Sequence, residues 1–138
     1  MIRFIVAFMA IAVPATAQQA PVTFVFGKTL PLGTGQWNYA AGVSGGEARF
    51  GAHFSLRCDR AARTMVVSRL GTPPAALTIA TDMQTRTLPA DGRLSANDPI
   101  LDAMAFSRGR IIVTGGSAGA LAVPSWPEAA RAIEDCRN

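Results

Sequence analysis

The clearest pattern in the chain is an alternation of apolar and polar residues between positions 48 and 59. The even positions carry Ala48, Phe50, Ala52, Phe54, Leu56 and Cys58, whereas the odd positions carry Arg49, Gly51, His53, Ser55, Arg57 and Asp59. Because successive side chains of a strand point to opposite faces, this alternation predicts a strand, or two strands joined at a bulge near Gly51. One face then lies in the core, with Cys58 on it, and the other faces water.

Shorter apolar runs, separated by turn residues, predict further strands and antiparallel hairpins. Residues 64–70 return along the first strand after a polar turn, and residues 36–41, with Trp37 and Tyr39 on one side, lead into a hairpin loop at 42–46. Residues 110–114 and 120–123 flank a turn at 115–119. We also expect strands at 77–83, with Leu77, Ile79 and Met83 on one face, and at 86–89, whereas residues 22–28 are a weaker candidate.

Two segments carry helical signals instead. Asp98 followed by Pro99 suits the start of a helix that reaches about Phe106, because Asp is a preferred N-cap and proline fits the first helical turn. A second helix is predicted near 126–137, where Ser125 and Glu128 have the spacing of a capping box. Its expected apolar face consists of Trp126, Ala129, Ala130, Ile133 and Cys136. Both cysteines should therefore point toward the core.

Together these elements predict a mostly β (α+β) fold. We expect an antiparallel β-sandwich or open barrel, with a short helix near 98–106 and a C-terminal helix near 126–137. The two cysteines of the chain, Cys58 and Cys136, are 78 positions apart, and a disulfide between them would remove unfolded-chain entropy worth about 4–5 kcal/mol. Two unpaired buried thiols, or half of a metal site, are the alternatives.

The first 17 residues have the layout of a secretory signal peptide. Arg3 precedes an apolar run from Phe4 to Val13, and the small residues Ala15-Thr16-Ala17 suit a cleavage site. We therefore expect residues 1–17 to be removed and residues 18–138 to form a single mature domain, located in the periplasm or secreted. An apolar run of ten residues is too short to span a bilayer, so no stable membrane insertion is expected after cleavage.

Charge argues against nucleic acid as a partner. Removal of Arg3 leaves twelve basic residues against nine acidic ones, a formal charge of +3. The eleven remaining arginines are scattered along the chain rather than clustered, which is not the pattern of a nucleic-acid-binding surface.

No catalytic, metal or cofactor constellation emerges from the sequence. Residues 115–119 match the G-x-S-x-G string around a nucleophilic Ser117, but the following residues predict a strand where that motif requires a helix. Asp98 is explained by helix capping, and Asp102 and Glu134 by exposed helix surface, so we expect no carboxylate pair for acid–base chemistry. One histidine and two cysteines leave no credible zinc site.

Two surfaces are candidates for binding. Arg49, His53 and Arg57 share the polar face of the alternating strand and could recognise an anionic group, although a solvated face explains them as well. Ser107, Arg108 and Arg110 lie in a loop between the first helix and a strand, where binding residues often sit.

The order of these elements resembles that of a known family. Arg57-Cys58-Asp59 on a strand, Leu101-Asp102-Ala103-Met104 leading into Gly109-Arg110-Ile111-Ile112-Val113, and a terminal helix with Cys136 are similar to the invasion-associated locus B proteins over 54–136. The segment from Pro124-Ser125-Trp126-Pro127-Glu128 to Cys136-Arg137 resembles the end of uncharacterised small exported alphaproteobacterial proteins. The first resemblance implies a periplasmic, sandwich-like fold and a non-enzymatic envelope role; the chain lacks the extra cysteines that many of those proteins carry.

The leading hypothesis is a non-catalytic binding protein of the cell envelope that recognises another envelope protein or an anionic ligand. The alternative is an inhibitor of a periplasmic cell-wall hydrolase or protease. Periplasmic lysozyme inhibitors are similarly small, β-rich and disulfide-tied, and they plug an active site with a loop, as residues 107–110 could do. Their loop has a different residue order.

Overall fold

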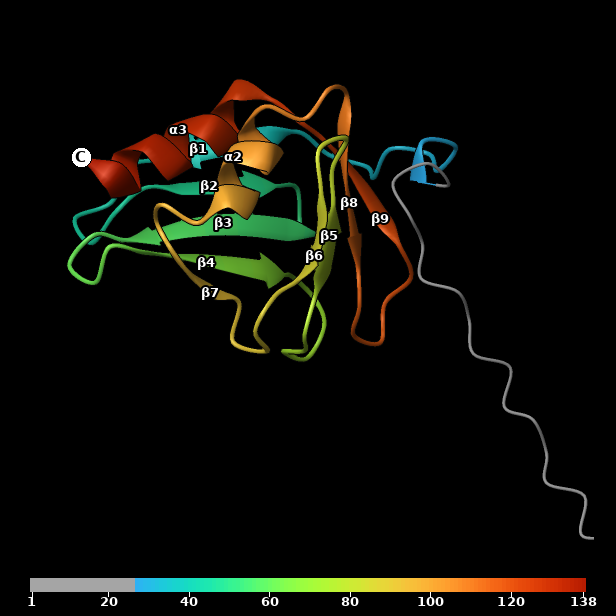
Figure 1. Ribbon diagram of the computed structural model, residues 1–138, viewed down its shortest axis with the longest axis horizontal. Helices are drawn as coiled ribbons and strands as arrows, with labels where there is room; N and C mark the ends of the chain where they lie inside the picture. Colours follow the sequence, from blue (N-terminus) through green and yellow to red (C-terminus); the bar gives the residue numbers. More distant parts are fainter. Residues whose placement is uncertain (1–26) are drawn as a thin grey trace, which may run out of the picture.

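The computed structural model describes residues 27–138, which form two antiparallel sheets and two helices (Figure 1). Strands β1 (Trp37–Ala40), β2 (Glu47–Phe50), β3 (Phe54–Asp59), β4 (Thr64–Arg69) and β7 (Arg93–Ser95) form one sheet in the order β1-β2-β3-β4-β7. Strands β5 (Thr78–Ala80), β6 (Thr85–Thr87), β8 (Arg110–Thr114) and β9 (Leu121–Pro124) form the other in the order β6-β5-β8-β9. The helices are α2 (Pro99–Ala105) and α3 (Pro127–Arg137). This mostly β, sandwich-like architecture confirms the predicted fold class.

The alternating segment folds into two strands rather than one. Strands β2 and β3 pair antiparallel with Phe50 opposite Phe54, so the chain reverses within residues 51–53. Gly51 adopts φ +51°, a backbone conformation that glycine tolerates and that a tight reversal requires. The expected bulge at Gly51 is therefore a hairpin turn. Phe50, Phe54, Leu56 and Cys58 are buried as predicted, but Ser55, predicted on the wet face, is also buried, and Ala52 lies exposed in the turn.

The four-stranded sheet contains the predicted hairpin of β8 and β9 and a shorter strand than expected at 77–83. Strand β5 ends at Ala80, because the chain turns at Thr81. Leu77 and Ile79 are buried as expected, but Met83 lies in the turn and is exposed, which corrects its predicted place on the same face. Strand β7 was not predicted; it is three residues long and only Leu94 is buried, so its sequence signal is weak.

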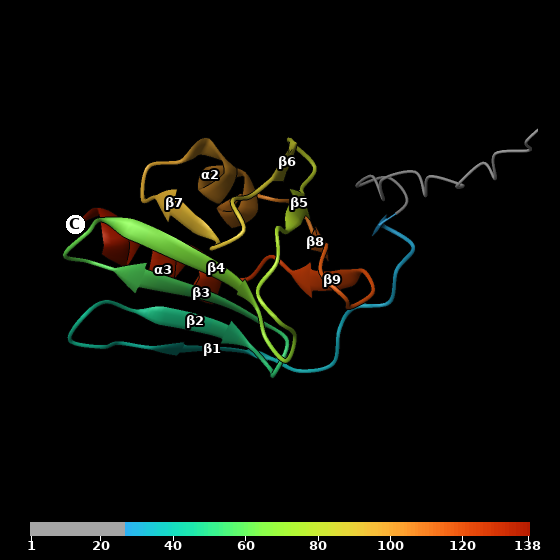
Figure 2. The ribbon, with the colours of Figure 1, turned by 90° about the horizontal axis from the view of Figure 1, so that it is seen from below.

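One core joins the two sheets and both helices. Buried side chains come from β1–β4, from β5, β8 and β9, and from both helices, and they form a single cluster. Figure 2 shows α3 behind the strands β1–β4, so the helix covers the inner face of that sheet, and no other helix or strand of residues 27–138 covers the outer face. The indole Nε1 of Trp37 also donates a hydrogen bond of 2.7 Å to the carbonyl of Pro124, which ties β1 to β9.

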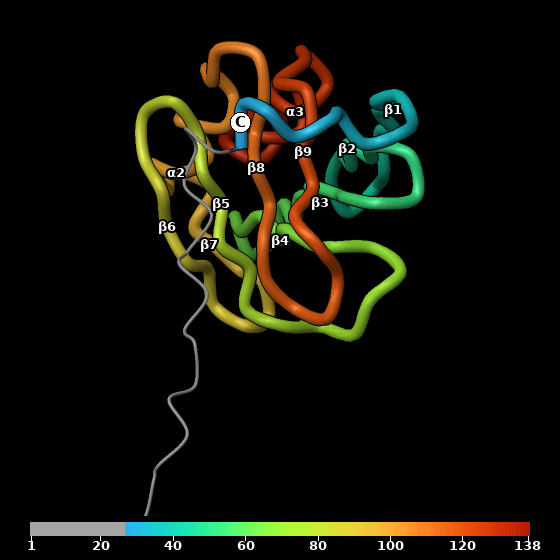
Figure 3. The backbone as a smooth tube through the Cα atoms, turned by 90° about the vertical axis from the view of Figure 1, so that its right-hand side faces the viewer, coloured from blue at the N-terminus to red at the C-terminus, as the bar shows by residue number. Residues whose placement is uncertain are grey.

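The chain before β1 runs across the four-stranded sheet, as Figure 3 shows from the side. Leu32 forms a parallel bridge with Ala122, and the Gly33 amide donates to the Ala122 carbonyl at 2.8 Å. Leu30 packs against a small buried group on that sheet, Ala80, Ile112 and Ala122. The predicted signal peptide and most of the weak strand candidate at 22–28 lie outside the described residues.

The helices begin near their predicted positions, but only one has the predicted cap. The Asp98 carboxylate accepts a hydrogen bond from the Ile100 amide and caps α2 as expected. At α3, however, the N-cap is Trp126, without a side-chain cap bond, and the Ser125 hydroxyl donates to the Met104 carbonyl instead. The predicted capping box of Ser125 and Glu128 is therefore wrong, because Ser125 joins α3 to α2.

The apolar face of α3 is rotated from the predicted one. Ala129, Ala132, Ile133 and Cys136 are buried, whereas Trp126 is exposed and Ala130 only partly covered. The helix is rotated because the side that carries Arg131 and Asp135 packs on β1. There Tyr39 donates a hydrogen bond to Asp135, and the Arg131 guanidinium lies 4.2 Å above the Tyr39 ring.

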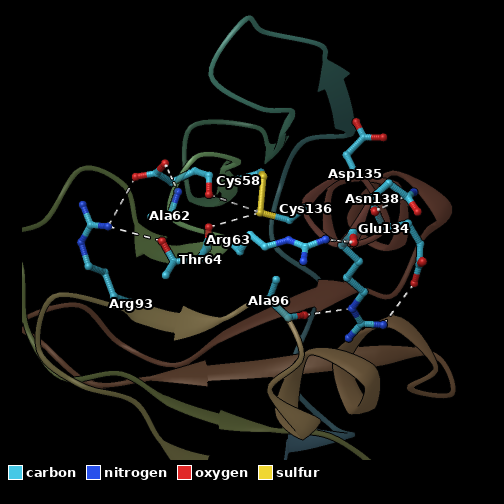
Figure 4. Close-up of a disulfide and its surroundings, with 12 residues drawn as sticks. Cys58, Ala62, Arg63, Thr64, Arg93, Ala96, Glu134, Asp135, Cys136 and Asn138 are labelled. Carbon is cyan, nitrogen blue, oxygen red and sulfur yellow. Dashed lines mark hydrogen bonds and ion pairs between the residues drawn. A yellow bond between two sulfur atoms is a disulfide. The ribbon is translucent and has the colours of Figure 1, made fainter.

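Cys58 on β3 and Cys136 on α3 form the predicted disulfide, with their Cα atoms 5.4 Å apart (Figure 4). A second set of contacts surrounds it. Arg137 donates to the Ala96 carbonyl at 2.9 Å and forms ion pairs with Asp102 on α2 at 2.8 Å and with Glu134 at 3.2 Å. The C-terminal helix is thus fixed covalently to the five-stranded sheet and by polar contacts to α2 and to the end of β7.

Replacing Cys58 and Cys136 together with alanine should lower the free energy of unfolding by about 2–5 kcal/mol, since the unfolded chain loses its cross-link over 78 positions. Urea denaturation of the mature protein measures the change. A reductant should lower the midpoint of the wild type to a similar extent and leave that of the double variant unmoved. Equal midpoints for wild type and variant would show that the bond contributes nothing.

Candidate functional site

Three loops meet at the end of the molecule that is uppermost in Figure 1, and we call them the loop cluster. They are the β5–β6 turn at 81–84, the segment 106–110 between α2 and β8, and the segment 125–126 between β9 and α3. The Ser107 hydroxyl donates to the Arg110 carbonyl at 2.9 Å and accepts the Asp82 amide at 3.5 Å. The Ser125 amide donates to the Gly109 carbonyl at 3.4 Å. These hydrogen bonds place the three loops side by side.

The loop cluster presents three large apolar side chains to solvent. Met83, Phe106 and Trp126 are 67%, 70% and 45% exposed. Met83 faces outward because Thr81 organises its turn: the Thr81 hydroxyl accepts the amides of Met83 and Gln84 at 3.2 and 3.1 Å. Exposed apolar side chains that gather on adjoining loops are typical of interaction surfaces, whereas isolated ones are common everywhere.

In the predicted binding loop, Ser107 and Arg110 make hydrogen bonds that support the loop, whereas Arg108 carries an unpaired charge. Ser107 is buried and holds its loop together, and the Arg110 side chain donates to the Leu30 carbonyl. Arg108 is exposed at the tip of the loop, beside Gly109 at φ +97°, and makes no hydrogen bond or ion pair to any residue of 27–138. Of the three predicted residues, Arg108 is the one that is free to meet a partner.

The second predicted surface is less basic than its sequence suggests. Arg49 and Arg57 lie on the outer face of the five-stranded sheet, but Glu47 is paired opposite Arg57 and its carboxylate lies 3.2 Å from Arg49. His53 is in the β2–β3 turn instead of on the strand face, and its Nε2 lies 3.4 Å from the Thr34 hydroxyl. The structure therefore does not gather these three residues into one cationic stripe.

The remaining candidate catalytic side chains are either paired with other residues or exposed to solvent. Ser117 is exposed in the β8–β9 turn and is followed by strand β9. Asp98 pairs with Arg86, Asp102 and Glu134 pair with Arg137, and Asp135 accepts from Tyr39. Within the described residues, no three His, Cys, Asp or Glu side chains converge in a way that could hold a metal ion.

The sequence predicts the loop that begins at Phe106 and contains Arg108, but not the exposure of Trp126 and Met83. Trp126 is predicted on an apolar helix face, because a large apolar residue is usually buried. Met83 was assigned to a strand. The exposed fractions of the three side chains show that they stand outside the core.

Comparison with protein-family models, with curated proteins and with solved structures gives no match. The resemblance to the invasion-associated locus B proteins stays a prediction. In residues 27–138 there is no helix with the length and apolar character needed to cross a membrane.

Replacing Arg108 with alanine should change the free energy of unfolding by less than about 0.5 kcal/mol, because the side chain is exposed and unpaired. Replacing Arg110 with alanine should lower it by about 1–2 kcal/mol, since the charged hydrogen bond to Leu30 is lost. Urea denaturation of the two variants in parallel tests the assignment. A larger loss for Arg108→Ala than for Arg110→Ala would reverse the two roles.

Proposed function

We propose that this chain is a non-catalytic binding protein that acts in the periplasm or outside the cell and docks on another envelope protein through its loop cluster. Export is supported by the pattern of residues 1–17 and by the disulfide, which persists in oxidising compartments. A binding role is supported by the exposed side chains of the loop cluster.

The single observation that carries the proposal is the exposure of Met83, Phe106 and Trp126 on three loops that are hydrogen-bonded to one another. Burying such side chains on a partner gains about 25 cal/mol for each Å² of apolar surface removed from water. Because the loops are already held in place, little conformational entropy is lost on docking. Aromatic residues, methionine and arginine are also the residue types enriched at protein interfaces.

Arg108 indicates the chemistry of the partner. Its guanidinium has no carboxylate of its own within 27–138, so a carboxylate on the partner would form a charge-assisted hydrogen bond at the edge of the apolar contact. The partner surface we propose is an apolar groove bordered by Asp or Glu side chains. Asp82 adds one negative charge to the β5–β6 turn, which favours a partner whose carboxylates face the Arg108 side of the cluster.

The braced loop at 107–110 also supports the second candidate, an inhibitor of a cell-wall hydrolase. Ser107 fixes the base of this loop while Arg108 stands free at its tip, which is the arrangement that a loop entering an active-site cleft needs. The catalytic clefts of glycoside hydrolases contain paired carboxylates, which an arginine would complement. The identity of the docked partner separates the two candidates.

A photo-reactive phenylalanine analogue placed at Phe106 or at Trp126 should cross-link the exported protein to one and the same envelope protein. The matched control is Val43, an exposed apolar residue that lies in the β1–β2 loop, away from the loop cluster. The control should give no such adduct, and Arg108→Glu should reduce the yield from position 106 several-fold, because a carboxylate then faces the partner's carboxylates. Mass spectrometry of the adduct identifies the partner.

Adducts that form equally from position 43, or that are insensitive to Arg108→Glu, would contradict docking through the loop cluster. An adduct with a cell-wall hydrolase would establish the inhibitor, and one with a non-enzymatic envelope protein would establish the envelope-binding role.

A further inference from the structure

A small cleft lies at the opposite end of the molecule from the loop cluster, between the loops that appear lowest in Figure 1. Its volume is about 140 Å³, roughly ten times what one buried water requires. This is well below the several hundred Å³ typical of drug-sized ligands. The cleft therefore suits a molecule of only a few non-hydrogen atoms.

Arg69 supplies a positive charge to this cleft. As the last residue of β4 it is paired opposite the buried Phe54, so its side chain leaves the strand on the core side of the sheet. Its guanidinium makes one long hydrogen bond, 3.5 Å, to the Val113 carbonyl, and it forms no ion pair with any residue of 27–138. Partial burial lowers the pKa of Arg69 from its ordinary value, although an arginine remains protonated. The charge is thus partly desolvated without a carboxylate to compensate it.

Arg137 shows how another half-buried arginine is compensated. Arg137 is also half-buried, but it meets Asp102, Glu134 and the Ala96 carbonyl. At Arg69 the same kind of side chain faces a cleft instead of a carboxylate.

Asp91 supplies a negative charge to the same cleft. One of its carboxylate oxygens accepts the Arg93 amide at 3.1 Å, and the group forms no ion pair within the described part of the chain. Thr72 contributes a hydroxyl-bearing side chain to the lining, and Pro73-Pro74 and Leu77 contribute apolar walls. The proline pair restricts the motion of the 71–76 loop, since each ring fixes one backbone dihedral. The cleft thus holds two opposite charges that do not pair with each other.

We propose that this cleft binds a small zwitterion of the α-amino acid type, with its carboxylate on Arg69 and its ammonium group toward Asp91. The carboxylate of the ligand can accept two hydrogen bonds from the planar guanidinium of Arg69. The ammonium group of the ligand then lies near Asp91, the one acidic side chain that lines the cleft. A purely anionic ligand would place a like charge next to Asp91 in the same cleft. The cleft is separate from the loop cluster, so the proposed ligand site does not depend on the proposed docking function.

Titration of ¹⁵N-labelled mature protein with L-alanine, acetate and ethylammonium, followed by amide chemical shifts, tests this site. L-Alanine should give saturable shifts confined to residues 67–75 and 90–92, with an affinity in about the millimolar range, as expected for six non-hydrogen atoms. Acetate should bind several-fold more weakly, and ethylammonium should give no saturable shifts.

Three variants sharpen the test. Arg69→Gln should weaken alanine binding about tenfold or more, whereas Asp91→Asn, which retains the acceptor for the Arg93 amide, should weaken alanine about threefold and leave acetate unchanged. Arg57→Gln is the matched control, because it removes an exposed arginine from the outer face of the adjacent strand β3 and should leave alanine binding unaltered.

Absence of saturable cleft shifts with alanine at tens of millimolar, or unchanged alanine binding in Arg69→Gln, would overturn the site. Equal affinity for acetate and alanine, together with no effect of Asp91→Asn, would overturn the zwitterion as the ligand. If Arg69→Gln fails to fold, the Asp91→Asn comparison of alanine with acetate still decides the question, because Asp91 is exposed.

Discussion

The bond between Cys58 and Cys136 fixes the C-terminal helix against the middle strand of the five-stranded sheet, and the rest of the structure depends on that contact. A sheet that faces water on one side needs a cover for its other side, and α3 provides much of it by packing on β1 through β4. The cross-link acts over most of the chain, so it limits the unfolded ensemble of a domain whose single core is modest in size.

The same clamp positions the surface that we propose to be functional. Because the end of α3 is held at Cys136, its beginning is directed toward α2, where Ser125 bonds to Met104 and Trp126 emerges into solvent. Phe106 and Arg108 follow α2 directly, so the loop cluster derives its order from the packing of the two helices. The cleft at Arg69 lies at the other end and depends instead on where β4 stops and the proline-containing loop turns back.

Much of the fold could be predicted because it is encoded in local periodicity. The alternation from Ala48 to Asp59 placed Cys58 inward, and helical spacing placed Cys136 inward, which together anticipated the disulfide. The predicted bulge at Gly51 is a hairpin turn, because a bulge within a strand and a tight turn between two strands leave the same alternation before and after the glycine. The Ser125 cap failed because a hydroxyl close to another helix has a competing acceptor, the Met104 carbonyl, which local sequence does not reveal. The functional surfaces are harder to predict. Arg108 can be found from its loop, but the exposure of Trp126 and the placement of Arg69 and Asp91 on one cleft depend on how distant segments pack.

The most direct test of the clamp is to count free thiols in the protein as the cell exports it. Material collected from the exported fraction is unfolded without reductant, treated with an alkylating reagent and digested for mass spectrometry. The disulfide predicts no alkylated cysteine and one peptide pair that joins Cys58 to Cys136. Two alkylated cysteines per chain would contradict both the clamp and the oxidising location on which the proposed function rests.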